Sequence, residues 1–431
     1  MYSSIKSLSL GGNMAKKKLL ILGANPETVS LIKKAKELGL YTIVTDNNPK
    51  AYAKRYADQA ENIDATDVNK LVALALREKV QGVVVGVAEA LLPAYCEVCE
   101  RLNLPCYSTK DKFELLTHKD LFKETCKKYQ VPTIEEYRIE DKSMIQYPVI
   151  VKPVDSCSSK GITVCATEKE LDKAVLYAKS YSSSGRILVE KYMHGDEVIA
   201  YYVIQDGHPI FVGMCDRYTY RANPESVQLP TAYIFPSKYV EAYLNYTDSA
   251  IKNMIKGIGL ANGSIFFQCF VDDQGVVRTY EAGYRLNGAQ EHLIISKFTG
   301  IDAKELYINF ALTGKATEDD LELLNKIKID KIACKLSPLV TTGKIFEIKG
   351  LEKIKQFPDV VSVNPSYDIG DEVTGEGTLK QIVCRFFIVS ANKLQLLKTI
   401  NKIYETFEVL NEKGKSMLIG KFDTKIIYEQ Y

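Results

Sequence analysis

Several common signatures are missing from this chain, and each absence excludes a class of protein. No apolar run approaches the roughly 18 residues that a membrane-spanning helix needs, so we expect no membrane partner. The formal net charge is only +2, because 56 Lys and Arg are balanced by 54 Asp and Glu. This balance argues against a dedicated nucleic-acid surface, so we expect no nucleic-acid partner. We find no internal repeat and no low-complexity segment.

The N-terminus also lacks a secretory signal, because residues 1–13 carry one lysine and no sustained apolar core. We expect a disordered leader there, with Met14 as a candidate true start. The ten cysteines are scattered, which favours reduced thiols in a cytoplasmic protein over a disulfide framework. Cys96 and Cys99 form a lone CxxC without a second pair at zinc-finger spacing, so we interpret both as packing residues.

A dinucleotide fingerprint is absent as well. The segment Gly23–Glu27 follows an apolar run but lacks the G-x-G-x-x-G spacing, which makes an NAD-dependent oxidoreductase a distant hypothesis. Asp46, at the end of the next apolar run, fits either a ribose-binding acid or a helix N-cap. The sequence leaves both interpretations of Asp46 open.

The first hundred residues nevertheless alternate in a regular way. Apolar runs predict strands, and amphipathic stretches predict helices between them. The expected strands are 18–23, 41–45, 82–86 and 104–107, and the expected helices are 26–38, 67–79 and 91–102. This β-α order implies a parallel sheet with right-handed crossovers.

The pattern changes near residue 108, which suggests further domains in a chain of 431 residues. We expect a helix at 112–129, then short strands, and a strand-rich block at 197–233. Later helices are expected at 168–181, 239–257, 288–299, 303–312 and 392–407, and a hairpin at 263–281. The fold class is therefore α/β and α+β, multidomain. The predicted domains are a leader at 1–13, an N-terminal domain at 14–111, a central domain at 112–318 and a C-terminal domain at 319–431.

The most informative stretch lies in the central domain. The apolar run Val149–Val151 ends in Lys152, and the small-residue segment 156–161, here named the phosphate loop, contains Lys160 and Gly161. Backbone N–H groups in such a loop approach an anion closely, and the lysines neutralise its charge. A second strand ends at Glu190, and Glu197 follows, so their carboxylates can accept from a base amine and from sugar hydroxyls. Together these pieces predict a nucleoside triphosphate site that is not a P-loop.

Other charged residues are ambiguous when taken alone. Lys119 is either a solvated lysine or a phosphate ligand, and Lys152 either forms an internal salt bridge or binds an anion. Glu281 and Arg285, at a strand end, form either a structural ion pair or a site where the carboxylate holds Mg²⁺ and the guanidinium holds an oxyanion.

The ordered set resembles the ATP-grasp superfamily of carboxylate–amine ligases, across roughly residues 15–431. The nearest groups are the L-amino-acid ligases and the biotin carboxylase, carbamoyl-phosphate synthetase and purine-ligase relatives. The resemblance implies an ATP-grasp fold with an N-terminal Rossmann-like (pre-ATP-grasp) sheet, a mobile lid at about 133–195 and a C-terminal β/α domain.

The resemblance also implies roles for individual residues. Lys119 and Lys152 are expected to hold the α- and β-phosphates, and the phosphate loop, with Ser156, Ser158, Ser159, Lys160 and Gly161, to close on the γ-phosphate. Nucleotide contacts are further expected from Glu190 (adenine amine), Lys191 and Tyr192 (backbone) and Glu197 (ribose). Glu281 and Gln268 are the expected metal positions, and Arg285 and Lys160 the expected catalytic residues.

Two positions depart from the family pattern. The family commonly has glutamate near Gln268 and asparagine near Gly283. A glutamine oxygen is an uncharged ligand for a hard cation, so Glu281 carries most of the protein's charge toward Mg²⁺ or Mn²⁺. Asn287 is a candidate substitute for the missing amide.

A few polar residues stay open between a substrate-facing role and an ordinary one. Asp216–Arg217 and Glu89 resemble substrate-facing positions, but a surface ion pair or an N-cap explains them equally well. For His194 and His292 we favour a surface loop, because nothing in the sequence pairs either with a carboxylate.

The leading hypothesis is an ATP- and Mg²⁺-dependent ligase that joins a small-molecule carboxylate to an amine through an acyl-phosphate, with an amino acid as one substrate, in a protein that is a candidate homodimer. The alternative is an ATP-binding protein with weak or no catalysis, which Gln268 keeps open.

Overall fold

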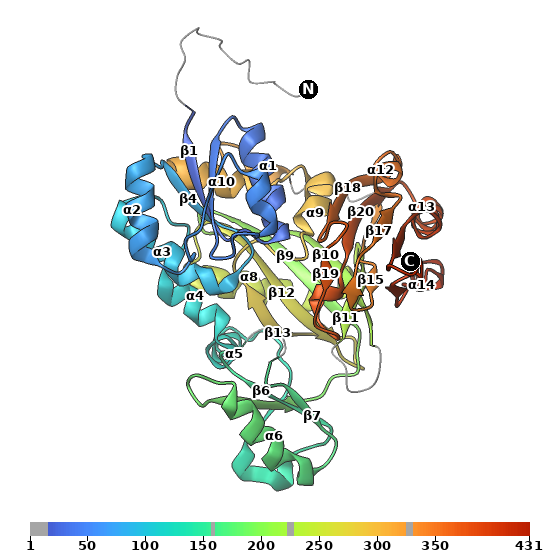
Figure 1. Cartoon of the computed structure of the whole chain (residues 1–431). Coiled ribbons are helices and arrows are strands. Elements are labelled where there is room, and N and C mark those ends of the chain that lie inside the picture. Colours follow the sequence, from blue (N-terminus) through green and yellow to red (C-terminus); the bar gives the residue numbers. More distant parts are fainter. Residues whose placement is uncertain (1–15, 157–159, 222–227, 325–330) are drawn as a thin grey trace.

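The computed structural model describes residues 16–156, 160–221, 228–324 and 331–431 (Figure 1). The leader predicted at 1–13 and two predicted nucleotide contacts, Ser158 and Ser159, lie outside the described residues. Within the described ranges, no helix is both long enough and apolar enough to cross a membrane.

The N-terminal lobe is built on a parallel sheet with strand order β3-β2-β1-β4. Its strands are β1 (Lys18–Leu22), β2 (Tyr41–Thr45), β3 (Gln59–Glu61) and β4 (Gly82–Val85), and its helices are α1 (Val29–Glu37), α2 (Val68–Glu78) and α3 (Leu92–Leu102). The apolar runs of β1, β2 and β4 are buried almost throughout, as parallel strands covered by helices require. The predicted parallel sheet is confirmed.

The fourth strand of that sheet is not the one expected. Residues 104–107 form no strand, because Pro105 lacks the N–H that a ladder needs. The edge strand is β3 instead, whose three residues Gln-Ala-Glu carry too little apolar character to be noticed in the sequence. Asp46 is not a helix cap, because its carboxylate accepts from the backbone N–H groups of Ala24 (3.1 Å) and Asn48 (2.8 Å). It thereby fixes the turn after β1.

The central sheet is antiparallel, with strand order β13-β12-β9-β10-β11-β14-β20-β18. Its strands are β9 (Glu197–Gln205), β10 (His208–Tyr220), β11 (Leu229–Phe235), β12 (Gly263–Val271), β13 (Val277–Gly283), β14 (Ile332–Leu336), β18 (Val360–Pro365) and β20 (Cys384–Ser390). The predicted hairpin joins β12 to β13. The sheet continues past residue 319, so the C-terminal strands extend the central domain's own sheet.

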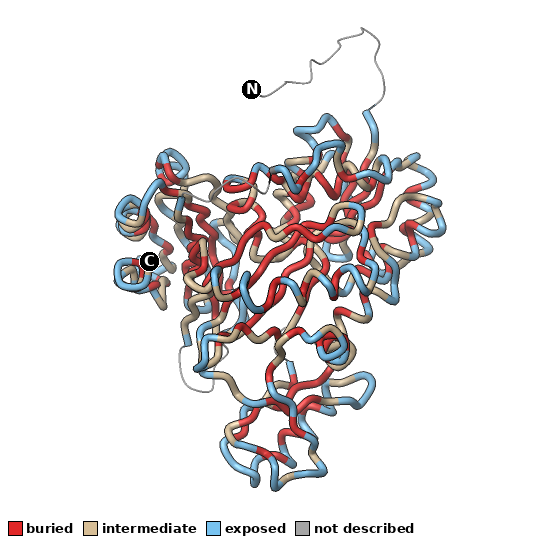
Figure 2. The backbone as a smooth tube through the Cα atoms, turned by 180° about the vertical axis from the view of Figure 1, so that it is seen from behind, coloured by how far each residue is buried: buried red, intermediate tan, exposed pale blue. Residues whose placement is uncertain are grey.

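The lid is a small separate layer at the end of the molecule opposite the N-terminal lobe (Figure 1). It contains β5 (Glu136–Tyr137), β6 (Val149–Pro153), β7 (Thr163–Cys165), β8 (Ile187–Lys191) and helix α6 (Glu168–Ser180). These elements enclose their own core, which includes Val149, Val151 and Leu171. Figure 2 shows this core as a short buried segment inside an exposed shell.

Two predicted helices are each broken into two. The helix expected at 112–129 is α4 (Lys110–Thr117) and α5 (Lys119–Lys128), because the backbone at His118 is extended. The helix expected at 239–257 is α7 (Val240–Tyr246) and α8 (Asp248–Gly257). The first break matters for the site, since it makes Lys119 the first residue of a helix that leads into the lid.

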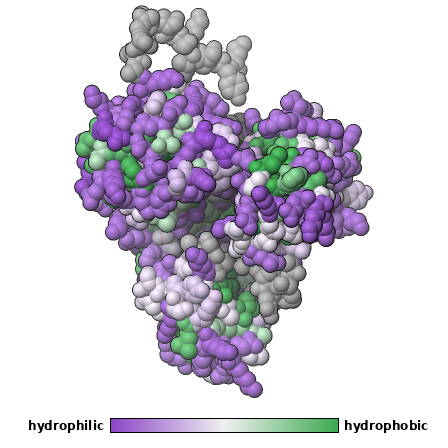
Figure 3. All heavy atoms as spheres, viewed as in Figure 1, coloured by the Kyte–Doolittle hydropathy of each residue, from purple (hydrophilic) through white to green (hydrophobic). Residues whose placement is uncertain are grey.

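The remaining elements frame the central sheet. Helices α9 (His292–Thr299) and α10 (Ala303–Thr313) follow β13, and α13 (Lys393–Thr406) and α14 (Lys425–Gln430) cover the C-terminal strands. Short ladders pair β15 (Leu339–Val340) with β22 (Leu418–Ile419), β16 (Gly343–Lys344) with β19 (Glu372–Val373), and β17 (Glu347–Lys349) with β21 (Glu408–Leu410). The face shown in Figure 3 is mostly hydrophilic and is hollowed between the N-terminal lobe and the C-terminal strands.

Candidate active site

Two predicted phosphate lysines stand at the junction between the lid and the central sheet. Lys152 ends β6 and is only 5% exposed, and its Nζ lies 5.9 Å from the ring centre of Tyr280 on β13. Lys119 begins α5, and its Nζ donates to the carbonyl oxygen of Ser156 at 2.7 Å. The Lys119 ammonium therefore lies at the start of the phosphate loop, whereas the Lys152 ammonium contacts Glu190 and faces Tyr280.

Glu190, on β8, is bound between two lysines. One carboxylate oxygen lies 2.5 Å from Lys152 Nζ, and the other forms an ion pair with Lys123 of α5. Burial acts to raise the pKa of Glu190, but the two lysines outweigh it and the pKa lies below its ordinary value. Glu190 thus forms an ion pair with Lys152. Its predicted contact with the adenine amine stays a prediction.

Lys123 is a site residue that the sequence reasoning missed. Its side chain is 6% exposed, and burial lowers its pKa. A signal was available, because Lys123 lies four residues after Lys119 on one helix, and residues at this spacing share a face.

The residues after β8 include the predicted backbone contacts to the nucleotide, Lys191 and Tyr192. The N–H of Tyr192 donates to the carbonyl oxygen of Pro148 at 3.0 Å, which fixes the backbone of this segment beside β6. The Tyr192 ring meets the ring of His194 edge-on at 4.9 Å. Lys191 and His194 are exposed, so the surface position expected for His194 is confirmed.

Glu197, the predicted ribose acid, begins β9. It faces Arg217 in the β9–β10 register, and the two side chains form an ion pair. Although burial opposes it, Glu197 raises the pKa of Arg217, so the guanidinium keeps its charge. Arg217 is thus an inward ion-pair partner rather than a surface residue.

Its neighbour Asp216 is also buried, at 2% exposure. Its carboxylate accepts from the backbone N–H of Lys238 at 3.2 Å and from the hydroxyls of Ser237 and Tyr431. Burial raises its pKa. The bonds to Lys238 and Ser237 hold the start of the segment leading into α7, which is an anchoring role.

The predicted metal positions Gln268 and Glu281 face each other directly across β12 and β13. The side-chain oxygen of Gln268 accepts from the Tyr280 hydroxyl at 2.8 Å. No group of three or more His, Cys, Asp or Glu that could hold a metal occurs in the described part of the chain. One carboxylate with an amide oxygen suits Mg²⁺ carried in on phosphate oxygens, but it does not suit a resident metal held by protein alone.

Arg285 is fixed by three different contacts. Its Nε and Nη2 donate to one carboxylate oxygen of Glu89 at 3.3 and 3.2 Å, and its guanidinium lies 5.3 Å from the ring centre of Phe266. A side chain at Gly283 would overlap that ring. Phe266 therefore fills the space next to Gly283 and supports Arg285, which explains the glycine in physical terms.

Glu89 is the point where three parts of the chain converge. Burial raises the pKa of Glu89, Arg285 and Lys119 oppose the rise, and Glu281 reinforces it. These residues come from the N-terminal lobe, the lid hinge and the central sheet. Glu89 is thus an inward residue of the site.

The described part of the phosphate loop has a defined base. Gly161 has φ +74°, and a Cβ there would lie 2.7 Å from Tyr181 Cβ, so glycine is required. Asp155, just before the loop, accepts from Ser183 Oγ at 2.7 Å and Ser184 N at 2.9 Å. Lys160 is exposed.

Glu291 and Lys335 form a second buried acid–lysine pair. Glu291 is 0% exposed and Lys335 is 1% exposed, and the closest approach of their charged atoms is 3.9 Å. Neither oxygen of Glu291 has a hydrogen-bond partner. Burial raises the pKa of Glu291 and lowers the pKa of Lys335 to about 7. The sequence contained no signal for this pair, since 44 positions separate its members and neither ends a recognisable motif.

His292 corrects a prediction. We expected a surface loop, but His292 begins α9, is 7% exposed, and has no partner for either ring nitrogen. Burial lowers its pKa to about 3, so the ring is neutral.

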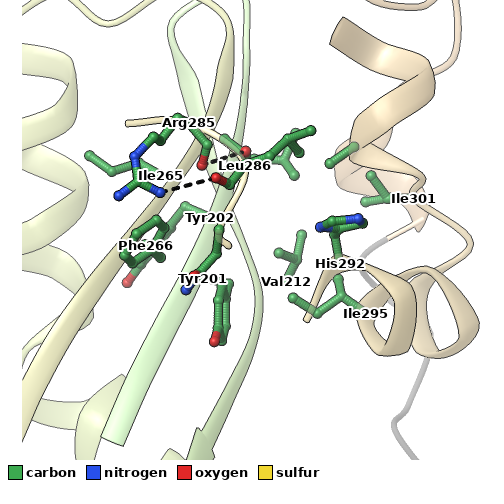
Figure 4. A pocket seen from close by; sticks show the side chains of 14 residues that line it. Tyr201, Tyr202, Val212, Ile265, Phe266, Arg285, Leu286, His292, Ile295 and Ile301 are labelled. Atoms are coloured by element: carbon green, nitrogen blue, oxygen red, sulfur yellow. Dashed lines mark hydrogen bonds between the residues drawn. The ribbon is translucent and has the colours of Figure 1, made fainter. Parts of the chain in front are cut away.

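His292 and Arg285 line opposite sides of one cavity of about 30 Å³, together with Tyr201, Asn287 and Ile295 (Figure 4). Arg285 and Phe266 extend from the strands, whereas His292 and Ile295 come from the α9 side (Figure 4). The Asn287 side-chain oxygen accepts from Ala289 N at 3.0 Å, so it shapes the local turn. The cavity has room for about one or two waters.

Comparison with known proteins places a family domain in the middle of the chain. Residues 145–291 match the family of the ATP-grasp domain. The chain is 26% identical over 325 residues to a 2-oxoglutarate carboxylase small subunit of Hydrogenobacter thermophilus, covering 68% of this chain and 66% of that protein. It is 23% identical over 415 residues to a carbamoyl phosphate synthase large chain of Clostridium beijerinckii, covering 90% of this chain but only 37% of that one.

Solved structures share the fold over nearly the whole chain. The biotin carboxylase domain of the H. thermophilus enzyme, crystallised with MgADP, ADP and bicarbonate, has a TM-score of 0.76 at 21% identity, covering 94% of this chain and 91% of that one. An L-amino acid ligase from Bacillus licheniformis has a TM-score of 0.74 at 18% identity, covering 92% and 99%. The predicted fold class and the resemblance to ATP-grasp ligases are confirmed.

Proposed function

We propose that this chain, which carries an ATP-grasp domain, is a ligase that uses ATP to activate a carboxylate and joins it to an amine with release of ADP. The observation that carries the proposal is the ion pair of Glu89 with Arg285, together with the influence of Lys119 and Glu281 on the pKa of Glu89. The charges that we assign to phosphate, metal and substrate thus act on one carboxyl group.

The chemistry needs positioning and charge neutralisation more than a covalent nucleophile. A carboxylate is a poor electrophile until its oxygen takes the γ-phosphoryl group, which then leaves as phosphate when the amine attacks. We assign Lys119 and Lys152 to the phosphates, and Glu281 and Gln268 to Mg²⁺, which would neutralise phosphate charge. Arg285 is placed to stabilise the acyl-phosphate and the oxyanion that follows.

The attacking amine must lose a proton, and Glu291 is the group we assign to accept it. It is a buried carboxylate whose two oxygens lack hydrogen-bond partners, and it directly precedes His292, which lines the cavity. Its raised pKa makes it a stronger base than an ordinary carboxylate.

An amino acid is the substrate class that the charges favour. Glu89 and Arg285 present an acid and a guanidinium side by side. A zwitterion carries the complementary ammonium and carboxylate groups, so it can meet both. This argument supports the amino-acid assignment without identifying the side chain.

An ADP-release assay with Mg²⁺ over pairs of amino acids and small carboxylic acids tests the proposal. We expect ADP formation that depends on both substrates and a new amide detected by mass spectrometry. The variant Glu281→Gln should lose the Mg²⁺-dependent turnover while ATP binding is partly retained; full activity of this variant would show that the metal is held elsewhere.

The second candidate is an ATP-binding protein without ligase activity, and Gln268 favours it. This residue supplies no charge to a metal and already accepts from Tyr280. Tight ATP binding with no turnover of any pair would select this alternative.

A further inference from the structure

Two thiols outside the proposed active site lie close together on the N-terminal lobe. Cys96 is on α3 and Cys106 follows that helix, and their sulfur atoms are 3.8 Å apart. The Cys106 thiol also donates to the carbonyl oxygen of Ser108 at 3.0 Å. Both cysteines are partly exposed, whereas the other seven described cysteines are buried. Among the described cysteines, these two are therefore the ones that a dissolved oxidant reaches.

The segment that carries Cys106 is hydrogen-bonded to the residue directly before Arg285. The hydroxyl of Tyr107 donates to the carbonyl oxygen of Tyr284 at 3.1 Å, and the Tyr284 hydroxyl donates back to the Tyr107 carbonyl oxygen at 3.3 Å. The two rings meet edge to face with centroids 5.2 Å apart. Movement of Cys106 is thus transmitted to the residue directly before Arg285.

The helix that carries Cys96 is connected to the other half of the same ion pair. Glu89 lies in the single helical turn Glu89–Leu91, and α3 follows it without a break. The Glu89–Arg285 contact is thereby supported by both cysteine-bearing segments. A bond between the two sulfurs would displace the segments that hold Glu89 and Arg285.

We propose that Cys96 and Cys106 are an oxidation site, at which a hydroperoxide forms an intramolecular disulfide that shifts the Glu89–Arg285 pair. Disulfide formation itself stands apart from the proposed function; the loss of turnover that we expect from it rests on that function. The sulfurs must move from 3.8 Å to about 2 Å, within reach of side-chain rotation and a small helix shift.

The reaction balances with the hydroperoxide as oxidant. One thiolate attacks the peroxide, the O–O bond breaks, and a sulfenic acid forms with release of water or alcohol. The second sulfur attacks the first, the S–S bond forms, the S–O bond breaks, and water leaves. The two sulfurs together lose two electrons, which reduce the peroxide.

Intact mass and peptide mapping of the full chain test the site directly. The experiment uses a C157S background, because Cys157 lies outside the described residues, and treats it with hydrogen peroxide before blocking free thiols. We expect loss of two hydrogens and a cross-linked pair of peptides containing Cys96 and Cys106. The variants C96S and C106S should each lack the cross-link, and C334S, a buried control, should keep it.

A cross-link between Cys99 and Cys106, or sulfinic acid without any cross-link, would overturn the assignment. The functional half is read by the ADP-release assay on oxidised and reduced wild-type protein, because C157S changes a position inside the phosphate loop. Oxidation should lower turnover roughly tenfold, because displacements of about 1 Å at a reacting group are costly, and dithiothreitol should restore it. If the cross-link forms but turnover is unchanged, the coupling to Arg285 is wrong. If the reduced protein has no turnover, the proposed function fails and the oxidation site stands alone.

Discussion

Glu190 and Glu291 are both buried carboxylates facing buried lysines, yet their surroundings shift their pKa values in opposite directions. Glu190 is in contact with two ammonium groups, one of them at 2.5 Å, and its pKa is lowered. Glu291 lies 3.9 Å from its single lysine, both its oxygens lack partners, and its pKa is raised. Burial is the same for both, so the difference arises from pairing.

This difference favours a stabilising role for Glu190 and a chemical role for Glu291. A buried ion pair is tolerated when close contacts offset the loss of hydration, as around Glu190. A buried carboxylate without partners costs free energy that the fold must supply, and such groups concentrate at functional sites. Glu190 is thus held closely between two lysines, whereas neither oxygen of Glu291 has a hydrogen-bond partner.

The largest expected effect is on catalysis at the unpaired carboxylate. Glu291→Gln should lower kcat by about 10²–10⁴-fold, the usual range for loss of a general base, with ATP affinity unchanged. Steady-state ADP release and calorimetry of ATP binding measure the two quantities. Glu305→Gln, a half-exposed acid on the neighbouring α10, is the control and should retain activity. Wild-type kcat in Glu291→Gln would remove Glu291 from the mechanism.

The paired carboxylate should instead govern stability. Glu190→Gln leaves two buried lysines without their acid and should cost about 3–5 kcal/mol in the free energy of unfolding. Urea denaturation followed by circular dichroism measures it. The control Glu136→Gln removes the more exposed pair with Lys127, at 2.9 Å, and should cost less than about 1 kcal/mol. Equal losses of unfolding free energy in the two variants would show that the buried Glu190 contributes no more to stability than the exposed Glu136 does.

A smaller effect is expected for nucleotide affinity. Lys152→Ala should raise the Kd for ATP tenfold or more, because a charge-assisted phosphate contact contributes about 1.5–3 kcal/mol. Lys142→Ala, which removes an exposed lysine on the same lid, should leave the Kd within about twofold. Calorimetry on both variants decides whether Lys152 serves the nucleotide or only Glu190.

The smallest effect is the pH dependence, and it should have opposite signs at the two acids. The lowered pKa of Glu190 gives stability that is present above its unfolded pKa of 4.5 and is lost as the pH falls. The raised pKa of Glu291 favours the folded state at low pH, and that contribution is lost as the pH rises from 4.5 through its folded value. The stability gap between wild type and Glu190→Gln should therefore shrink on acidification. On acidification, the free energy of unfolding of the wild type should rise relative to that of Glu291→Gln.

Much of this molecule follows from local patterns. The parallel sheet of the N-terminal lobe was predictable because buried apolar runs alternate with amphipathic helices, and a short polar edge strand, β3, was not. The breaks at His118 and Thr247 were missed because helical periodicity continues through both. His292 was misplaced because a histidine beside polar residues gives no sign of burial.

The sequence by itself determined the nucleotide-binding character, because strand ends, small-residue loops and charges at fixed intervals lie within short stretches. The prediction that Gln268 and Gly283 depart from the family pattern rests on the resemblance of these sequence motifs. Only the tertiary structure decided which charges neutralise one another: Lys123 and Lys152 with Glu190, Arg217 with Glu197, Arg285 with Glu89. It alone brought Lys335 to 3.9 Å from Glu291 and left both oxygens of that acid without a hydrogen bond. Partners far apart along the chain meet through sheet register and packing, and no local pattern encodes either.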